Sequence, residues 1–134
     1  MSTRERLARA GRLLKVQEQM RRGAEWELAA TRGRAAEIRE AEADLMTRLS
    51  AEGPLHGLFL DSAARRLRAL ARDAAAAEAL AQQQEAVARE RALEQKRSER
   101  RIGHLAAERR QEQERRDALD RLDGIVARGE REPG

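Results

Sequence analysis

Histidines and carboxylates are the side chains of this sequence whose types could do chemistry. The chain has two histidines, His56 and His104, and no cysteine, which excludes a thiolate metal site and a cysteine nucleophile. The two histidines are far apart in a chain that we expect to be helical, so they cannot share a metal ion or a reaction centre. We therefore expect no catalytic residue, no metal site and no cofactor, and we interpret both histidines as solvated side chains.

Acidic and basic side chains are interspersed along the whole chain. There are 24 Asp and Glu residues and 28 Lys and Arg residues, which gives a net charge of +4. At three- and four-residue spacing on a helix, such neighbours form surface ion pairs that contribute roughly 0.2–0.5 kcal/mol each. The glycines are scattered singly and form no phosphate-binding loop. The sequence thus predicts a protein that is not an enzyme and has no small-molecule substrate.

The elements that carry these side chains are predicted to be helices. Aromatic residues make up 1% of the chain and charged residues 39%. The chain therefore has too few bulky apolar side chains for a sizeable globular core. Ala, Leu, Glu and Arg dominate, as in coiled coils and long helices. No apolar run is long enough to cross a bilayer and no signal-peptide core is present, so we expect a soluble, cytoplasmic protein.

A first helix is predicted over about residues 3–52, with Ser2 or Thr3 as its N-terminal cap. Heptad spacing that starts at Leu7 defines one face of this helix. The positions on this grid are Leu7, Ala10, Leu14, Gln17, Arg21, Ala24, Leu28, Thr31, Ala35, Ile38, Glu42, Leu45 and Leu49. Because Leu13, Val16 and Met20 lie beside the grid, we expect a shift of register between Leu13 and Ala24.

A turn is predicted at residues 53–57, where Gly53 and Pro54 interrupt the helical pattern. A second helix then covers about residues 58–128, and residues 129–134 form a frayed tail. The fold class is all-α: one long antiparallel two-helix coiled-coil hairpin in which the second helix is longer and overhangs. Folding about the turn places Leu7 opposite a position near residue 103 and leaves residues beyond about 108 without an intramolecular partner. The expected packing positions of the second helix are Leu67, Leu70, Ala74, Ala77, Leu80 and Val87.

Three features could bind partners, and each has an alternative interpretation. Trp26 points away from the grid and either contacts a partner or packs on neighbouring Arg stems. The overhanging Leu119, Leu122 and Val126 are completed either by another protein or by a second copy of the chain. A basic stretch could bind nucleic acid or anionic lipid, but without interleaved aromatic residues a solvated helix face is the stronger interpretation. This stretch comprises Lys96, Arg97, Arg100, Arg101, Arg109 and Arg110.

Three segments together resemble the FliJ family of flagellar export proteins and their injectisome counterparts of the YscO type. They are residues 7–28 (LARAGRLLKVQEQMRRGAEWEL), 67–80 (LRALARDAAAAEAL) and 97–122 (RSERRIGHLAAERRQEQERRDALDRL). The shared features are heptads, charge, chain size and a longer second helix. The aromatic residues found near the hairpin end in some members are reduced here to Phe59.

The resemblance implies a function in type III protein export. Proteins of this family are similar to the stalk of rotary ATP synthases: their joined terminal helices enter the pore of a hexameric export ATPase. They promote ring assembly, connect the ring with the export gate in the membrane and assist export chaperones. Such a protein is cytoplasmic and peripherally associated with the inner-membrane export apparatus.

The resemblance also implies two sets of contact residues at opposite ends of the hairpin. The residues implied at the ATPase ring are Arg4, Leu7, Leu14, Leu105, Arg109, Arg110, Leu119, Leu122 and Val126. The residues implied at the export gate are Leu45, Leu49, Phe59 and Leu60. Two other classes of function fit the residues as well: a structural or adaptor coiled coil, and a basic protein that binds nucleic acid or a membrane surface.

Overall fold

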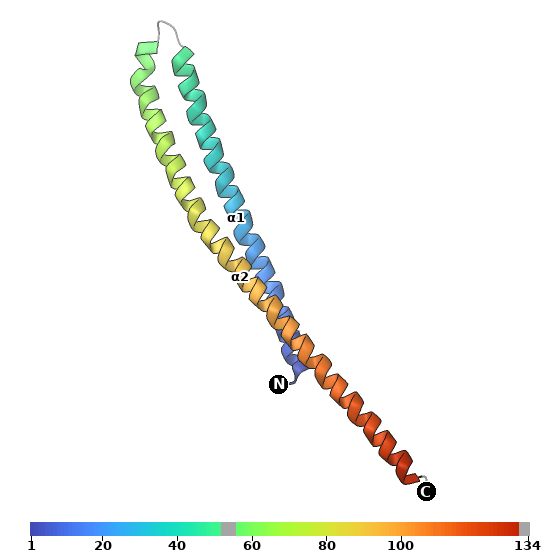
Figure 1. The fold of residues 1–134 in the computed structure, drawn as a ribbon. Coiled ribbons are helices and arrows are strands. Elements are labelled where there is room, and N and C mark those ends of the chain that lie inside the picture. Colours follow the sequence, from blue (N-terminus) through green and yellow to red (C-terminus); the bar gives the residue numbers. More distant parts are fainter. Residues whose placement is uncertain (52–55, 132–134) are drawn as a thin grey trace. The chain divides into compact units, whose positions relative to one another are not determined.

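The computed structural model describes residues 1–51 and 56–131 of the chain. Helix α1 spans Thr3–Ala51 and helix α2 spans His56–Arg131, with 49 and 76 residues respectively. Within the described ranges the chain forms no strand. Figure 1 traces α1 from blue to green and α2 from green to red. The predicted all-α fold, with two long helices in contact and the second one longer, is confirmed.

The ends of the helices lie close to the predicted positions. Ser2 caps α1, since its Oγ accepts a hydrogen bond from the backbone N–H of Glu5 at 3.1 Å. Helix α2 begins at His56, two residues before the predicted start, so His56 and Gly57 belong to the helix and not to the turn. At the other end, α2 continues to Arg131, which makes the first residues of the predicted tail helical. Gly53 and Pro54 lie outside the described residues.

The chain divides into two compact units, each built from parts of both helices. One unit comprises Gln19–Leu93, and the other comprises Met1–Glu18 and Glu94–Gly134. We call the line of side chains along which α1 and α2 pack in each unit the seam, and we describe the two units separately.

In the unit Gln19–Leu93 the seam is narrow and rich in alanine. Leu28 packs with Ala81 and Ala88, and half-buried Ala24 lies against them. Small side chains allow two helices to approach closely. The other buried residues of this seam are Thr31, Ala35, Leu70, Ala74 and Ala77.

Ion pairs connect the two helices beside this seam. Nε and Nη2 of Arg39 donate to the Glu78 carboxylate, at 2.7 and 3.2 Å, and Nη1 donates to the Glu42 carboxylate at 2.9 Å. The carboxylates raise the pKa of Arg39, and its hydrogen bonds lower the pKa of Glu78. Arg32 pairs with Glu85 at 3.3 Å. The two helices of this unit are therefore antiparallel, as predicted.

The predicted shift of register in α1 is wrong. Leu13, Val16 and Met20 are 50%, 51% and 40% exposed, whereas every position of the Leu7 grid is buried or half-buried. The polar grid positions stay in place because each has a partner: Ser98 donates a hydrogen bond to Gln17, and Arg21 pairs with Glu25 at 2.9 Å. A polar residue that has a hydrogen-bond or ion-pair partner and an aliphatic stem can occupy a seam position, so no shift of register is needed.

The prediction for the seam of α2 is wrong at two positions. Leu80 and Val87 are 38% and 45% exposed, and the buried residues are their neighbours Ala81 and Ala88. From Leu67 onwards, alternating steps of three and four residues lead through buried or half-buried positions as far as Leu105. The larger Leu80 and Val87 lie just outside this line.

In the unit Met1–Glu18 and Glu94–Gly134, the buried apolar residues of the described part are Ala10 and Leu105, at 8% and 4% exposure. Arg6 pairs with Glu108 at 3.0 Å, and the Thr3 hydroxyl donates to Glu112 at 2.8 Å. The pairing therefore reaches Glu112, a few residues further along α2 than predicted.

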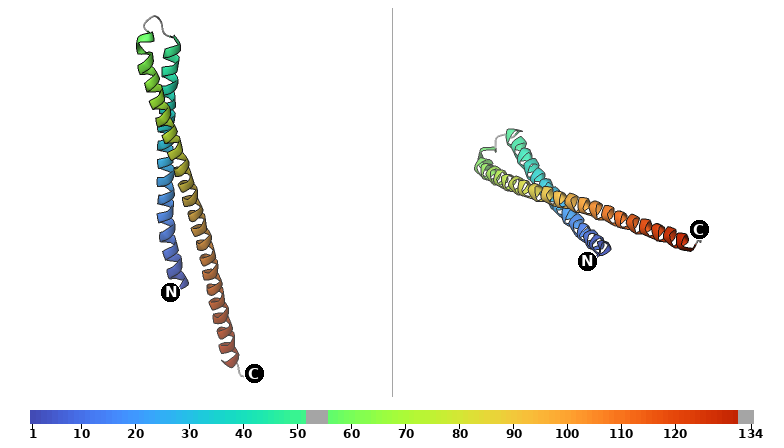
Figure 2. Two further views of the ribbon diagram at one scale, coloured as in Figure 1. Left: turned by 90° about the vertical axis from the view of Figure 1, so that its left-hand side faces the viewer. Right: turned by 60° about the horizontal axis from the view of Figure 1, so that its bottom comes forward.

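Past Glu112, α2 continues without α1. In the two views of Figure 2, the last turns of α2 extend beyond the N-terminus of α1. Residues 113–129 are exposed, with the exception of half-buried Ala118. The predicted overhang is thus present, and it begins at about residue 113.

Candidate partner-binding surface

The nine residues implied at the ATPase ring fall into two groups. Leu105 is 4% exposed, and Leu7 and Leu14 are half-buried. These three leucines form the seam between the helices and are not available to a partner while the helices are paired. The other six are exposed: Arg4, Arg109, Arg110, Leu119, Leu122 and Val126.

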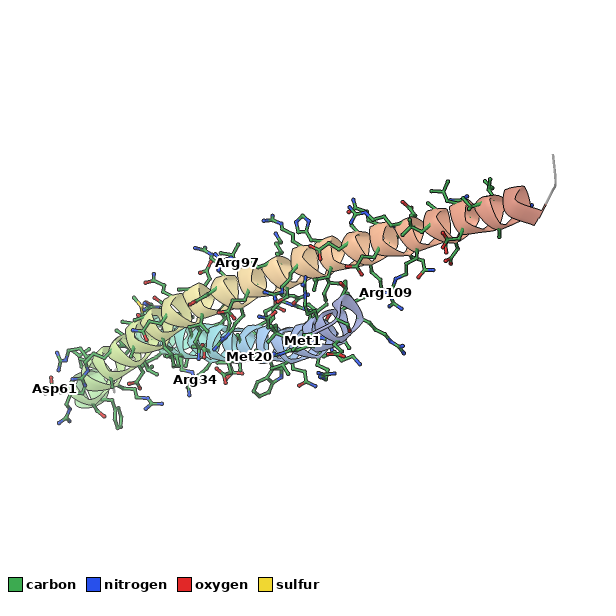
Figure 3. All side chains as sticks on the ribbon, turned by 90° about the horizontal axis from the view of Figure 1, so that it is seen from below. Met1, Met20, Arg34, Asp61, Arg97 and Arg109 are labelled. Atoms are coloured by element: carbon green, nitrogen blue, oxygen red, sulfur yellow. The ribbon has the colours of Figure 1, made fainter. Side chains whose placement is uncertain are left out.

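Arg4 and Arg109 line one hollow, although they are far apart in sequence. It is formed by the start of α1 and the part of α2 beside it, and Figure 3 shows Arg109 close to the beginning of α1. Arg116 adds a third guanidinium, and Glu112, which accepts the Thr3 hydrogen bond, is the carboxylate among them. This excess of positive charge would favour an acidic partner. The complete lining is Ser2, Thr3, Arg4, Arg109, Glu112, Gln113 and Arg116.

Large apolar side chains gather on one side of the overhang. Leu119, Leu122, Ile125 and Val126 are 56–59% exposed. Helical spacing of three and four residues brings them to one side, together with half-buried Ala118. We call these five residues the terminal face. Ile125 and Ala118 were not among the residues implied by the family resemblance, and three- and four-residue steps from Leu122 lead to both.

The terminal face adjoins the line of the seam. The buried positions of α2 include Ser98 and Leu105, and the same seven-residue step leads on to Glu112, Leu119 and Val126. Leu122, Ile125 and Ala118 widen the face to one side of that line. A partner helix could therefore pack on the overhang with the same heptad geometry that α1 uses further back.

The four residues implied at the export gate differ in their exposure to solvent. Leu45 and Leu49 are half-buried in the seam. Phe59 and Leu60 are 59% and 46% exposed near the start of α2. Only the second pair is available to a partner in the folded hairpin.

The other predicted features are solvent-exposed. Trp26 is 73% exposed. Lys96, Arg97, Arg100 and Arg101 are exposed as well, but Ser98 between them is buried, so the basic stretch is divided by the seam. Arg101 lines a hollow with Met1, Arg9 and Leu13.

The histidine and carboxylate side chains that the structure describes are dispersed along the helices. His104 is exposed. Across residues 1–51 and 56–131, no group of three or more His, Cys, Asp or Glu side chains is placed to hold a metal ion. None of the described helical segments is apolar over a length that could span a membrane.

Comparisons with protein-family models, with curated proteins and with solved structures found no match for this chain. The resemblance to the FliJ and YscO families therefore rests on the residues and on the arrangement of the two helices.

Proposed function

We propose that the protein is a stalk of the FliJ and YscO type in a type III protein export system. The observation that carries the proposal is the terminal face, which stands on an overhang directly past the N-terminus of α1. An apolar helix face of this kind gains most of its stability from packing against another surface. A hexameric export ATPase is the partner that the family resemblance supplies.

In this proposal the exposed residues at the overhang contact the ATPase ring. Leu119, Leu122 and Val126 pack against apolar surface of the pore, and Arg4, Arg109 and Arg110 attract its carboxylates. Leu7, Leu14 and Leu105 act indirectly, because they hold α1 against α2 and so keep Arg4 beside Arg109. Export chaperones are further partners, and nucleic acid is not.

The start of α2 is the end that meets the export gate in this proposal. Phe59 and Leu60 are its exposed apolar side chains. Leu45 and Leu49 are half-buried near the end of α1. The protein is then cytoplasmic and peripherally associated with the inner-membrane export apparatus.

The test measures phosphate release by the export ATPase of the same genome, titrated with this protein. We expect the full chain to stimulate hydrolysis, and we expect the double variant Leu119→Glu, Leu122→Glu to need at least about tenfold more protein for the same effect. A truncation that ends before Arg115 should lose the stimulation. If the full chain changes neither hydrolysis nor ring assembly, the proposal is wrong.

The matched control is Leu93→Glu. Leu93 is 52% exposed, close to the 56% of Leu122, and lies on the same helix far from the overhang. It should stimulate hydrolysis like the unmodified chain. A Phe59→Ala variant separates the two ends: it should leave stimulation unchanged and weaken capture of the export gate protein. Equal loss of stimulation in the Leu93 and Leu122 variants would contradict a ring contact at the overhang.

A further inference from the structure

We infer that in the absence of other partners the terminal face is covered by the same face of a second copy of this chain, with the two α2 helices parallel and in register. This inference does not rest on the proposed function, because it concerns the chain alone. It starts from the exposure of the face, where four large apolar side chains are each more than half accessible to water. Pairing two such faces would remove this apolar surface from water.

The charged residues beside the terminal face indicate that a second copy of the chain can pack on it. Leu122 lies at the centre of the face, and on a helix the residues directly before and after it lie about 100° to either side. These residues are Arg121 and Asp123, so one flank is basic and the other acidic. One heptad earlier the signs are reversed: Glu114 lies on the flank of Arg121, and Arg116 lies on the flank of Asp123.

This arrangement is self-complementary in only one orientation. In a parallel pair of helices the left flank of one helix meets the right flank of the other, whereas in an antiparallel pair like flanks meet. A parallel second copy therefore brings Arg121 opposite Asp123, and Glu114 opposite Arg116, on both sides of the interface. An antiparallel copy centred on Leu122 brings Arg121 against Arg121 and Asp123 against Asp123.

The flanking charges are available for such contacts. Arg121 donates to the backbone carbonyl of Asp117 in its own helix, at 3.3 Å, and Arg128 does the same with Gly124 at 3.2 Å. For Arg121 and Asp123, no ion pair is found within the described ranges. Upstream on the same side of α2, Arg101, His104 and Glu108 replace the apolar residues, so the paired length is limited to the overhang.

Single-cysteine variants test the orientation directly, because the chain has no cysteine of its own. In a parallel pair, Ala118→Cys and Val126→Cys should each form a disulfide-linked dimer under mild oxidation. In an antiparallel pair about Leu122, neither would do so alone, and only a mixture of the two variants would be linked. Gly124→Cys, on the opposite side of the helix, is the control and should stay mostly monomeric.

Sedimentation equilibrium of the full chain supplies a measurement without cross-linking. We expect reversible dimers, and Leu122→Glu should raise the dissociation constant at least about tenfold, while Leu93→Glu should not change it. Arg121→Asp alone should also weaken the dimer, and adding Asp123→Arg should restore it. A chain that stays monomeric to millimolar concentration, or cysteine variants that link only as a mixture, would overturn the inference. Neither result would bear on stimulation of an ATPase.

Discussion

The seam of the unit Gln19–Leu93 and the terminal face of α2 share the same heptad spacing but contain side chains of different size. Within that unit α2 is buried mainly through Ala74, Ala77, Ala81 and Ala88. The terminal face instead presents four large apolar side chains that are all exposed. The buried positions of α2 in that unit are thus mostly small, whereas the exposed face of the overhang is formed mainly by large apolar side chains.

This difference separates the two sources of stability in a long helix. Alanine has the best intrinsic helix propensity and permits close packing, so the paired part of α2 is stable through propensity and contact together. The overhang has propensity alone, and its leucines gain nothing from being exposed to water. The large side chains are therefore better explained by an intermolecular contact than by the stability of the hairpin.

The largest expected effect is that of a leucine inside the seam. Leu28→Ala removes a side chain that is 8% exposed and packs with Ala81 and Ala88, so we expect a loss of about 2–3 kcal/mol in the free energy of unfolding. Leu122→Ala, on the terminal face, should change it by less than about 0.5 kcal/mol in dilute solution. Urea denaturation followed by circular dichroism measures both. Equal losses would mean that the terminal face is packed within the monomer.

Replacing a polar residue in the seam should instead raise the free energy of unfolding. The Oε1 atom of Gln84 is buried and has no hydrogen-bond partner. An unsatisfied buried acceptor costs about 1–3 kcal/mol, so Gln84→Leu should stabilise the hairpin by about 1 kcal/mol or more. Gln83→Leu is the matched control, since Gln83 is exposed and its replacement should have little effect. A destabilised Gln84→Leu variant would show that the amide has a partner in solution.

Replacing glycines inside the helices should have smaller effects, which again distinguish the paired helices from the overhang. An added Cβ at Gly33 or Gly124 meets nothing within 4 Å. Gly33→Ala should raise the stability of the paired helices by about 0.5–1 kcal/mol, because alanine loses less backbone entropy on folding. Gly124→Ala should increase the helicity of the overhang without moving the main unfolding transition. A shift of that transition by Gly124→Ala would indicate that the overhang unfolds together with the hairpin.

The fold can be predicted from the sequence because helix propensity and the position of the helix-breaking residues indicate the same two helices. Helix formers fill both arms, and Gly53 and Pro54 supply the interruption between them. The grid that starts at Leu7 describes the buried face of α1 at every position. The buried face of α1 can be predicted because a seven-residue spacing is a property of the sequence and does not depend on how α2 is aligned with α1.

The errors concern positions where two apolar lines run side by side along a helix. Leu80 and Val87 are predicted in the seam from their heptad-like spacing, but a four-residue step from Ala77 leads to Ala81, and a further seven residues lead to Ala88, and these two are the buried residues. Leu13 suggested a stutter because the hydrogen bond from Ser98 to Gln17 across the seam was not foreseeable. Such a pair depends on the alignment of the two helices, and burial at the candidate site depends on it in the same way. The position of the turn predicts that Leu105 has α1 beside it and that Leu122 does not, whereas the extension of the pairing to Glu112 depends on this alignment.

The smallest predicted effect concerns the ion pair between Arg39 and Glu78 and appears as a dependence on pH. The guanidinium donates two hydrogen bonds to the carboxylate and lowers the pKa of Glu78 below its usual 4.5, although partial desolvation opposes this. A carboxyl group with a lower pKa in the folded state adds stability above its unfolded pKa and loses it as the pH falls through the folded pKa. The urea midpoint of the unmodified chain should therefore exceed that of Glu78→Gln at pH 7, and the gap should close in acid below the usual value. Glu90→Gln is the control, an exposed carboxylate on the same helix. A gap for Glu78→Gln that is the same at neutral and acidic pH would show that the pair is not formed in solution.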